Sequence, residues 1–211
     1  NKKEINLISS HGHTVFHQPR KGFTYQIGCG KEISITTNIT SVSDFRSLDV
    51  AHGGQGAPLV PIGDLFLFSD YEYCLNIGGI ANVSYDSKKK RIAGDIDFAN
   101  INSNYLSKRL GYPMDENGNL AMNGEFNELL FNELKNCSFY KESFPKSLGI
   151  EDYLSWYEPI LKKFNISVNN QLHTTGILLC ENIKKLIEHK EKNKLLITGG
   201  GAFNSFWIQT L

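Results

Sequence analysis

One stretch, residues 43–61, constrains this chain most, because it joins charged side chains to a loop of nearly fixed shape. An aspartate, an arginine, a second aspartate and a histidine follow the apolar, β-branched run 33–42. Three glycines, which allow close backbone approach, and two prolines, which fix the angle φ, come next. Charged groups between a strand end and such a loop are typical of a polar-substrate site in an α/β protein. The alternative is an ordinary strand-to-helix connection with a surface ion pair.

Composition excludes several classes of function. The 211 residues carry 22 Lys and Arg against 22 Asp and Glu, so no dense basic face indicates a nucleic-acid partner. No apolar run reaches the ~20 residues of a membrane span and no signal peptide is visible, so we expect a cytoplasmic protein without a membrane partner. The four cysteines are scattered without a CxxC pair, so no metal-binding residues are predicted.

Three histidines, His11, His13 and His17, lie close together near the start of the chain. A metal site would need further ligands, and no carboxylate or cysteine lies nearby in the sequence. We therefore expect His11 and Thr14 to offer hydrogen bonds to a ligand or to neighbouring backbone.

Alternating and apolar runs predict the secondary structure. Strands are expected at residues 5–9, 23–28, 31–40, 91–97 and 194–197, with a hairpin in 73–85. Helices are expected at residues 59–68, 100–110, 126–134, 152–164 and 172–189. This order predicts an α/β protein made of parts of two lobes, residues 1–68 and residues 69–211.

Two glycine turns are candidates for binding phosphate or nucleotide. Gly78 and Gly79 lie between Asn76 and Asn82, and such a turn can present backbone N–H groups to a phosphate. A plain hairpin is the alternative there. The glycines 199–201 follow a short apolar strand, where a nucleotide can lie close to backbone, although the run matches neither GxGxxG nor a P-loop.

Taken together, these residues resemble the anhydro-N-acetylmuramic acid kinases, of the sugar kinase, Hsp70 and actin superfamily. The matching stretches occur in the family's order: 10–19, 44–46 with Asp49, 53–61, 75–82, 145–147 with Gly149, and 199–202 with Asn204. The resemblance implies part of a ribonuclease H-like actin/sugar-kinase fold, with the sugar on the first lobe and the nucleotide on the second. It also implies an enzyme that uses ATP and Mg²⁺ to open 1,6-anhydro-N-acetylmuramic acid and phosphorylate O6, in recycling of the bacterial cell wall. A homodimer is the expected assembly.

The resemblance also implies roles for individual residues. Asp44 would be the catalytic base that takes a proton from the water attacking the anomeric carbon, and Arg46 would orient Asp44 or neutralise charge beside it. The sugar side would be lined by His11, Gly12, Thr14, Gln55 and Gly56. The nucleotide side would be lined by Asn76, Gly78, Gly79, Asp95, Asn100, Gly199, Gly200 and Gly201.

The chain departs from the family's pattern at three places. The stretch 94–100 keeps Asp95 and Asn100 but lacks the glycines and proline expected there. The family's N-terminal phosphate turn and its C-terminal segment are absent, so we expect a fragment that is inactive by itself. The alternatives are a non-catalytic relative that binds sugar or nucleotide, and a kinase of the same superfamily with another acceptor.

Overall fold

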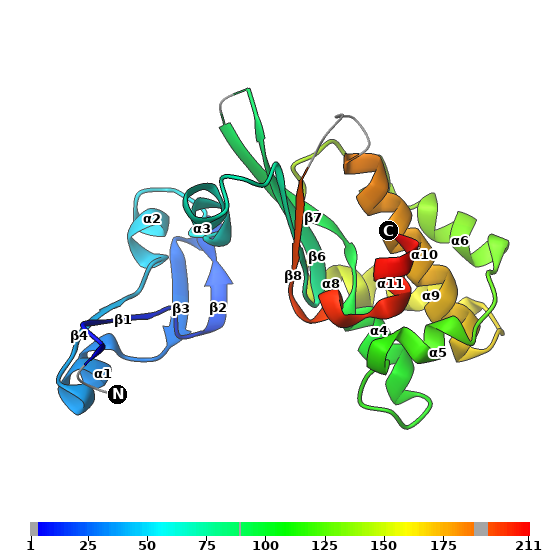
Figure 1. Ribbon diagram of the computed structural model, residues 1–211, viewed down its shortest axis with the longest axis horizontal. Coiled ribbons are helices and arrows are strands. Elements are labelled where there is room, and N and C mark those ends of the chain that lie inside the picture. The colour runs from blue at the N-terminus through cyan, green and yellow to red at the C-terminus, as the bar shows by residue number, and fades with distance from the viewer. Residues whose placement is uncertain (1–3, 89, 188–193) are drawn as a thin grey trace. The chain divides into compact units, whose positions relative to one another are not determined.

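The computed structural model describes residues 4–88, 90–187 and 194–211. The chain divides into two compact units, Asn1–Val60 and Pro61–Leu211 (Figure 1). Both combine helices and strands, which confirms the predicted α/β class. The interpretation of these units as two kinase lobes divided at residue 68 stays a prediction. No described helix has the length and apolar character needed to cross a membrane.

The first unit is built on two pairs of strands. Strand β1 (Leu7–Ser10) runs parallel to β4 (Thr40–Ser43), and β2 (His13–Gln18) is antiparallel to β3 (Phe23–Ile27). The short helices of this unit are η2 (Pro19–Lys21), α1 (Gly30–Thr37) and α2 (Ser47–Ala51). The first and second predicted strands are thus confirmed as β1 and β3.

The predicted strand at residues 31–40 is wrong, because most of it forms helix α1. Its isoleucines and threonines favour strands only weakly, and local contacts override that preference. The Thr37 hydroxyl donates to the carbonyl of Ile33 at 2.7 Å, inside the helix. Asn38 ends the helix in the left-handed region, at φ 53°. The chain then enters β4, which ends directly before Asp44.

The second unit contains a four-stranded sheet in the order β7-β6-β5-β8. Its strands are β5 (Tyr73–Ile77), β6 (Ile80–Ser87), β7 (Lys90–Phe98) and β8 (Leu195–Thr198). The first three are antiparallel neighbours, and β8 lies parallel to β5. This confirms the predicted hairpin and the two further strands. It is also the strand arrangement of a ribonuclease H-like sheet, as the resemblance implies.

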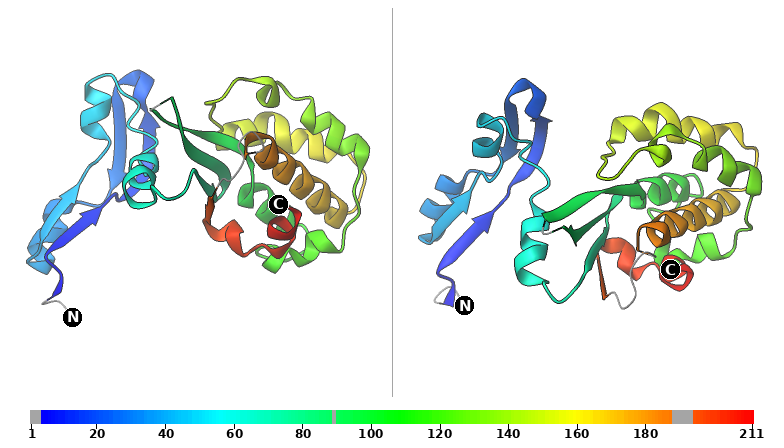
Figure 2. Two further views of the ribbon diagram at one scale, coloured as in Figure 1. Left: turned by 45° about the horizontal axis from the view of Figure 1, so that its top comes forward. Right: turned by 90° about the horizontal axis from the view of Figure 1, so that it is seen from above.

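Helices pack against one face of this sheet (Figure 2). The helices of the second unit are α3 (Val60–Leu67), α4 (Asn100–Lys108), η3 (Glu116–Gly118), α5 (Asn119–Met122), α6 (Glu128–Lys135), α7 (Ser138–Lys141), α8 (Ile150–Asp152), η4 (Tyr153–Tyr157), α9 (Glu158–Lys163), α10 (Val168–Ile187), η5 (Gly200–Phe203) and α11 (Ser205–Thr210). The predicted helices are confirmed, with the last beginning at Val168 rather than Leu172. Its predicted end, His189, lies outside the described residues.

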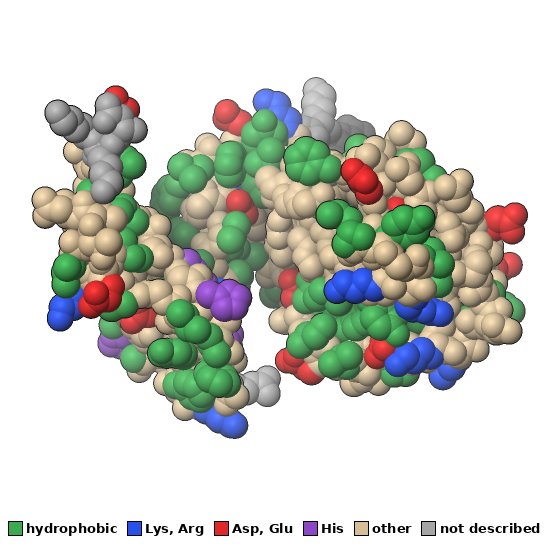
Figure 3. Space-filling model, turned by 90° about the horizontal axis from the view of Figure 1, so that it is seen from below, with side chains coloured by type: hydrophobic (Ala, Val, Ile, Leu, Met, Phe, Trp, Pro, Cys, Tyr) green, Lys and Arg blue, Asp and Glu red, His purple; other side chains and the backbone are tan. Residues whose placement is uncertain are grey.

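Apolar side chains fill the space between helices and sheet. Leu75 and Ile77 of β5 are fully buried, as are Leu178 and Ile183 of α10. Apolar side chains also reach the surface of both units (Figure 3). At about 25 cal/mol per Å² of buried apolar surface, the hydrophobic effect is the main stabilising contribution to the second unit.

A buried carboxyl group, Asp97, links β7 to the helices. The Tyr140 hydroxyl donates to its Oδ1 at 2.6 Å, and the Asn182 amide of α10 donates to its Oδ2 at 2.9 Å. Burial raises the pKa of Asp97 from 3.8 to about 6, although these hydrogen bonds and that from the Phe98 backbone N–H oppose the rise. The native state therefore takes up a proton here at a higher pH than the unfolded chain.

We expect this proton uptake to make Asp97 a pH-dependent contributor to stability. As pH rises from 3.8 to about 6, the native protein holds the proton more tightly than the unfolded chain, so the free energy of unfolding falls. Asp97→Asn cannot titrate. The wild type should therefore gain stability relative to Asp97→Asn, by about 1.4 kcal/mol, when pH is lowered from 7.5 to 5. Urea unfolding of both proteins at each pH measures this, and an unchanged difference between them would contradict it.

Candidate functional site

Arg46 is the centre of a hydrogen-bonded group in the first unit. It lies in the turn between β4 and α2, and its Nε donates to Nε2 of His11 at 2.8 Å. Its Nη1 donates to the carbonyl of Gly56 at 3.1 Å. Because Nε2 of His11 accepts, the ring proton sits on Nδ1, which donates to the carbonyl of Gly12 at 3.1 Å. Three predicted site residues, His11, Arg46 and Gly56, are thus brought into direct contact.

Asp44 lies at the end of β4 with its backbone in the left-handed region, at φ 60°. An aspartate tolerates this conformation better than most residues do. The Ser47 hydroxyl donates to Oδ1 of Asp44 at 2.5 Å. Among the described residues, no hydrogen bond or ion pair joins Asp44 to Arg46. The structure therefore places these two residues side by side in the chain but gives them different partners.

The other predicted sugar-side residues, Gly12, Thr14 and Gln55, lie in the same unit as Arg46. Gly12 has φ 70°, and a Cβ there would collide with the carbonyl oxygen of Ile27, so packing alone accounts for this glycine. The Thr14 hydroxyl oxygen is enclosed without a hydrogen-bond partner. Gln55 is exposed, and its backbone is hydrogen-bonded to the ring of His17.

Three further polar residues of this region, His17, Thr24 and Gln26, were not among the predicted site residues. Nδ1 of His17 lies 3.1 Å from the Thr24 hydroxyl, and the Gln26 amide donates to the same hydroxyl at 2.6 Å. Burial lowers the pKa of His17, and the positive charge of Arg46 lowers it further. A signal was available, because Thr24 and Gln26 are the polar members of an alternating strand.

In the second unit, the Gly78–Gly79 turn is hydrogen-bonded to the start of α4. The Asn100 side-chain amide donates to the carbonyl of Gly78 at 2.8 Å, and its backbone N–H donates to the same carbonyl at 3.1 Å. The carbonyl of Gly79 accepts from the backbone of Ala99 and of Ile101, both at 3.0 Å. The first N–H groups of α4 are therefore already paired with the turn.

The second glycine turn lies beside the first. Gly199 has φ 81°, and a Cβ there would come within 2.6 Å of Oδ1 of Asn76 and 2.7 Å of the carbonyl oxygen of Ile77. Gly200 is open by comparison, since the nearest atom to a Cβ there is Nδ2 of Asn100 at 3.7 Å. Gly201 is buried against Ile77. Asn76, Asn100 and both glycine turns are thus brought together at one end of the sheet.

A row of polar side chains crosses the sheet at the same level. Thr198, Asn76, Asn82 and Asp95 are cross-strand neighbours in β8, β5, β6 and β7, and opposed residues share a face. Asn82 and Thr198 were not among the predicted site residues, although Asn82 is paired with Asn76 in the hairpin of β5 and β6. The row places predicted and missed residues on the face opposite Leu75 and Ile77.

Asp95 contacts the loop after α7 rather than the glycine turns. Its Oδ2 accepts from the backbone N–H of Leu148 at 2.8 Å, and its own N–H donates to the carbonyl of Lys146, also at 2.8 Å. Burial raises the pKa of Asp95, and hydrogen bonds from Leu148 and Ser147 oppose the rise. Within the described residues, no three His, Cys, Asp or Glu side chains gather closely enough to hold a metal ion.

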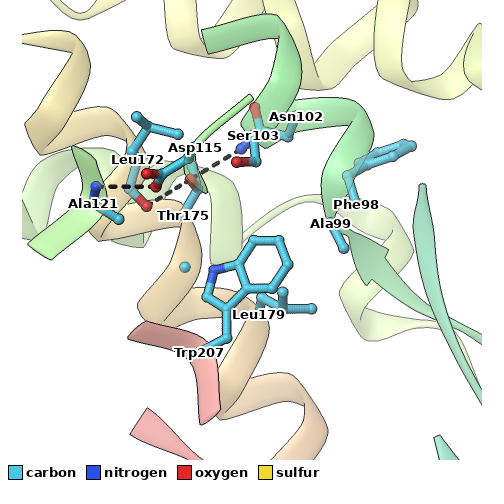
Figure 4. Close-up of a pocket in the computed structure, with 11 residues that line it drawn as sticks. Phe98, Ala99, Asn102, Ser103, Asp115, Ala121, Leu172, Thr175, Leu179 and Trp207 are labelled. Carbon is cyan, nitrogen blue, oxygen red and sulfur yellow. Dashed lines mark hydrogen bonds between the residues drawn. The ribbon is translucent and has the colours of Figure 1, made fainter. Parts of the chain in front are cut away.

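A small cavity of about 10 Å³ lies among α4, α5, α10 and α11 (Figure 4). Asn102 donates to the Thr175 hydroxyl at 2.9 Å on one side of it, and the Ala121 backbone donates to Asp115 at 3.1 Å on another. Such a volume is about that of one water molecule. The cavity is therefore too small for a nucleotide base.

The family model for anhydro-N-acetylmuramic acid kinase matches residues 1–211, the whole chain. The chain belongs to this family. The resemblance inferred from the sequence motifs is thereby confirmed. The fold class inferred with it agrees with the sheet order of the second unit.

Curated relatives in several bacteria carry the name anhydro-N-acetylmuramic acid kinase. The chain is 38% identical to that of Legionella pneumophila (strain Corby) and 35% identical to that of Vibrio parahaemolyticus, with 99% of this chain and 60% of the relative covered in each case. Identity to the relative in Bacillus thuringiensis is 33%, again over 99% of this chain and 60% of the relative. The chain therefore spans about 60% of the length of the curated relatives it matches.

The chain is also similar, at lower identity, to solved structures. Component A of the (R)-2-hydroxyglutaryl-CoA dehydratase of Acidaminococcus fermentans is 13% identical, with a TM-score of 0.42 over 92% of this chain and 67% of that one. This score is too low to establish a common fold. The family match and the strand order carry the assignment.

Proposed function

We propose that the protein is an ATP-dependent kinase that hydrolytically opens 1,6-anhydro-N-acetylmuramic acid and phosphorylates O6, yielding N-acetylmuramic acid 6-phosphate. The observation that carries the proposal is the family match over the whole chain. The product belongs to recycling of the bacterial cell wall. A cytoplasmic location and a homodimeric assembly are part of the same proposal.

Asp44 is the proposed general base. A carboxylate at a strand end can take a proton from water as that water attacks the anomeric carbon. The Ser47 hydroxyl, 2.5 Å from Oδ1, fixes the orientation of the carboxylate and leaves Oδ2 for the water. Opening of the anhydro ring then frees O6, the acceptor of the phosphoryl group. Positioning and electrostatics carry most of phosphoryl transfer, so a held carboxylate suits this task.

The nucleotide side is proposed to use the two glycine turns with Asn76 and Asn100. The openness of Gly200 supports close approach of a ligand to backbone at that residue. Mg²⁺ in kinases rests largely on phosphate oxygens with one or two carboxylates. Mg²⁺ is proposed to bind as a complex with the phosphates of ATP, where it would offset their negative charge.

The test is ADP release by the full-length natural protein, measured in a coupled assay with and without 1,6-anhydro-N-acetylmuramic acid. We expect ADP release that depends on the sugar, together with formation of the 6-phosphate, detected by mass spectrometry. Binding of sugar and ATP without turnover would instead identify a non-catalytic relative. Turnover with a different sugar alone would reject the proposed substrate.

A further inference from the structure

Arg46 carries a positive charge that no carboxylate neutralises in the part of the chain the structure describes. Its two acceptors, Nε2 of His11 and the carbonyl of Gly56, are both neutral. The ion pairs found among the described residues lie in the second unit, and none includes Arg46. A half-buried charge costs free energy unless it is paired with an opposite charge. A bound anion would therefore be stabilised beside the Arg46 guanidinium.

The two carboxylates closest to Arg46 in the sequence have other partners. Asp49 accepts from the backbone N–H of Gly56 at 2.6 Å, and Asp44 accepts from Ser47. Both hold backbone or side chains of their own loop in place. The guanidinium is therefore fixed by neutral groups, and it has more N–H donors than its two hydrogen bonds use.

The groups hydrogen-bonded to Arg46 are polar and uncharged. His17 is within electrostatic reach of the guanidinium, and its ring is hydrogen-bonded to Thr24. Neutral hydrogen-bonding groups around an unpaired guanidinium form a suitable environment for a carboxylate, which Arg binds with two parallel hydrogen bonds.

We propose that Arg46 binds the carboxylate of the substrate's lactyl substituent and thereby selects muramic-acid-type sugars over neutral amino sugars. The proposal rests on the proposed function, because that function supplies the sugar. The lactyl carboxylate is the ionised group of 1,6-anhydro-N-acetylmuramic acid. Arg46 is then a specificity-determining residue with a role separate from that of Asp44.

The test compares two sugars that differ only in the lactyl group, 1,6-anhydro-N-acetylmuramic acid and 1,6-anhydro-N-acetylglucosamine. The full-length wild type should prefer the first in kcat/KM. In Arg46→Met this preference should fall by about tenfold to a hundredfold, mainly through KM, as expected for loss of a hydrogen bond to a charged group. Arg46→Lys should keep part of the preference. Lys31→Met, which removes an exposed positive charge from the same unit, is the matched control and should keep all of it.

Three outcomes would overturn the proposal. If the wild type has equal kcat/KM for the two sugars, there is no selectivity for Arg46 to explain. Equal losses for both sugars in Arg46→Met would mean that the guanidinium acts on Asp44 or on the transferred phosphoryl group. An unchanged preference in a folded Arg46→Met, checked by circular dichroism, would exclude a role in selectivity. Calorimetric binding of both sugars separates this question from the proposed function, because a protein that prefers the carboxylate sugar without turnover fails only as a kinase.

Discussion

Asp44→Asn is expected to lower kcat of the full-length protein about 10²–10⁴-fold with little loss of folding. Asparagine has nearly the size of aspartate and also tolerates the left-handed backbone, at φ 60°, that this residue adopts. Its Oδ1 can still accept from the Ser47 hydroxyl. The amide cannot accept the proton of the attacking water, and the same step must also free O6. Binding of sugar and ATP should survive, since it depends mainly on other residues.

The measurement is kcat for the wild type and three variants, with folding checked by circular dichroism. Ser47→Ala removes the hydrogen bond to Asp44 and should cost far less than Asp44→Asn, because the carboxylate remains. Asp70→Asn changes an exposed carboxylate outside both glycine turns and should leave kcat unchanged. An Asp44→Asn variant with kcat within about threefold of the wild type, far below a general-base effect, would remove Asp44 from the mechanism.

Much of the second unit could be predicted because its signals are local and agree with one another. The run 73–85 alternates around two glycines, and it forms the hairpin of β5 and β6. The helical spacing in 172–189 predicted α10, whose apolar side chains pack in the core as far as Ile187. The first unit was harder. The isoleucines and threonines of 31–37 favour a strand, but this preference is weak and depends on context, and the segment forms α1.

The sequence could indicate which residues belong to the candidate site, but not which of them contact one another. A sequence can indicate that Arg46 and Asp44 are close along the chain, but it cannot show that Arg46 turns to His11, which is 35 residues away. Asp95 was grouped with the glycine turns, but it accepts from the Leu148 backbone of a distant loop. These hydrogen-bond partners depend on which strands pair and on where a distant loop packs, and neither is encoded in the local sequence. Thr198 was missed for the same reason, because β8 joins the sheet beside β5 from a distant part of the chain.

Gly200→Val is expected to weaken ATP binding to the full-length protein by about tenfold or more, equivalent to roughly 1.4 kcal/mol. A β-branched side chain at this position would occupy the space through which a nucleotide approaches the backbone. The protein itself has room for a Cβ at this position, because the nearest atom to it is Nδ2 of Asn100 at 3.7 Å. The substitution therefore tests the ligand rather than the fold.

Gly199→Ala provides the contrast. A Cβ at Gly199 would lie 2.7 Å from the carbonyl oxygen of Ile77, and φ of 81° strains any residue with a side chain. This variant should lose thermal stability, whereas Gly200→Val should melt near the wild type. Calorimetric titration of ATP into each folded protein gives Kd. If Gly200→Val binds ATP as tightly as the wild type, the nucleotide does not approach this turn, and the glycines 199–201 are explained by packing against β5 alone.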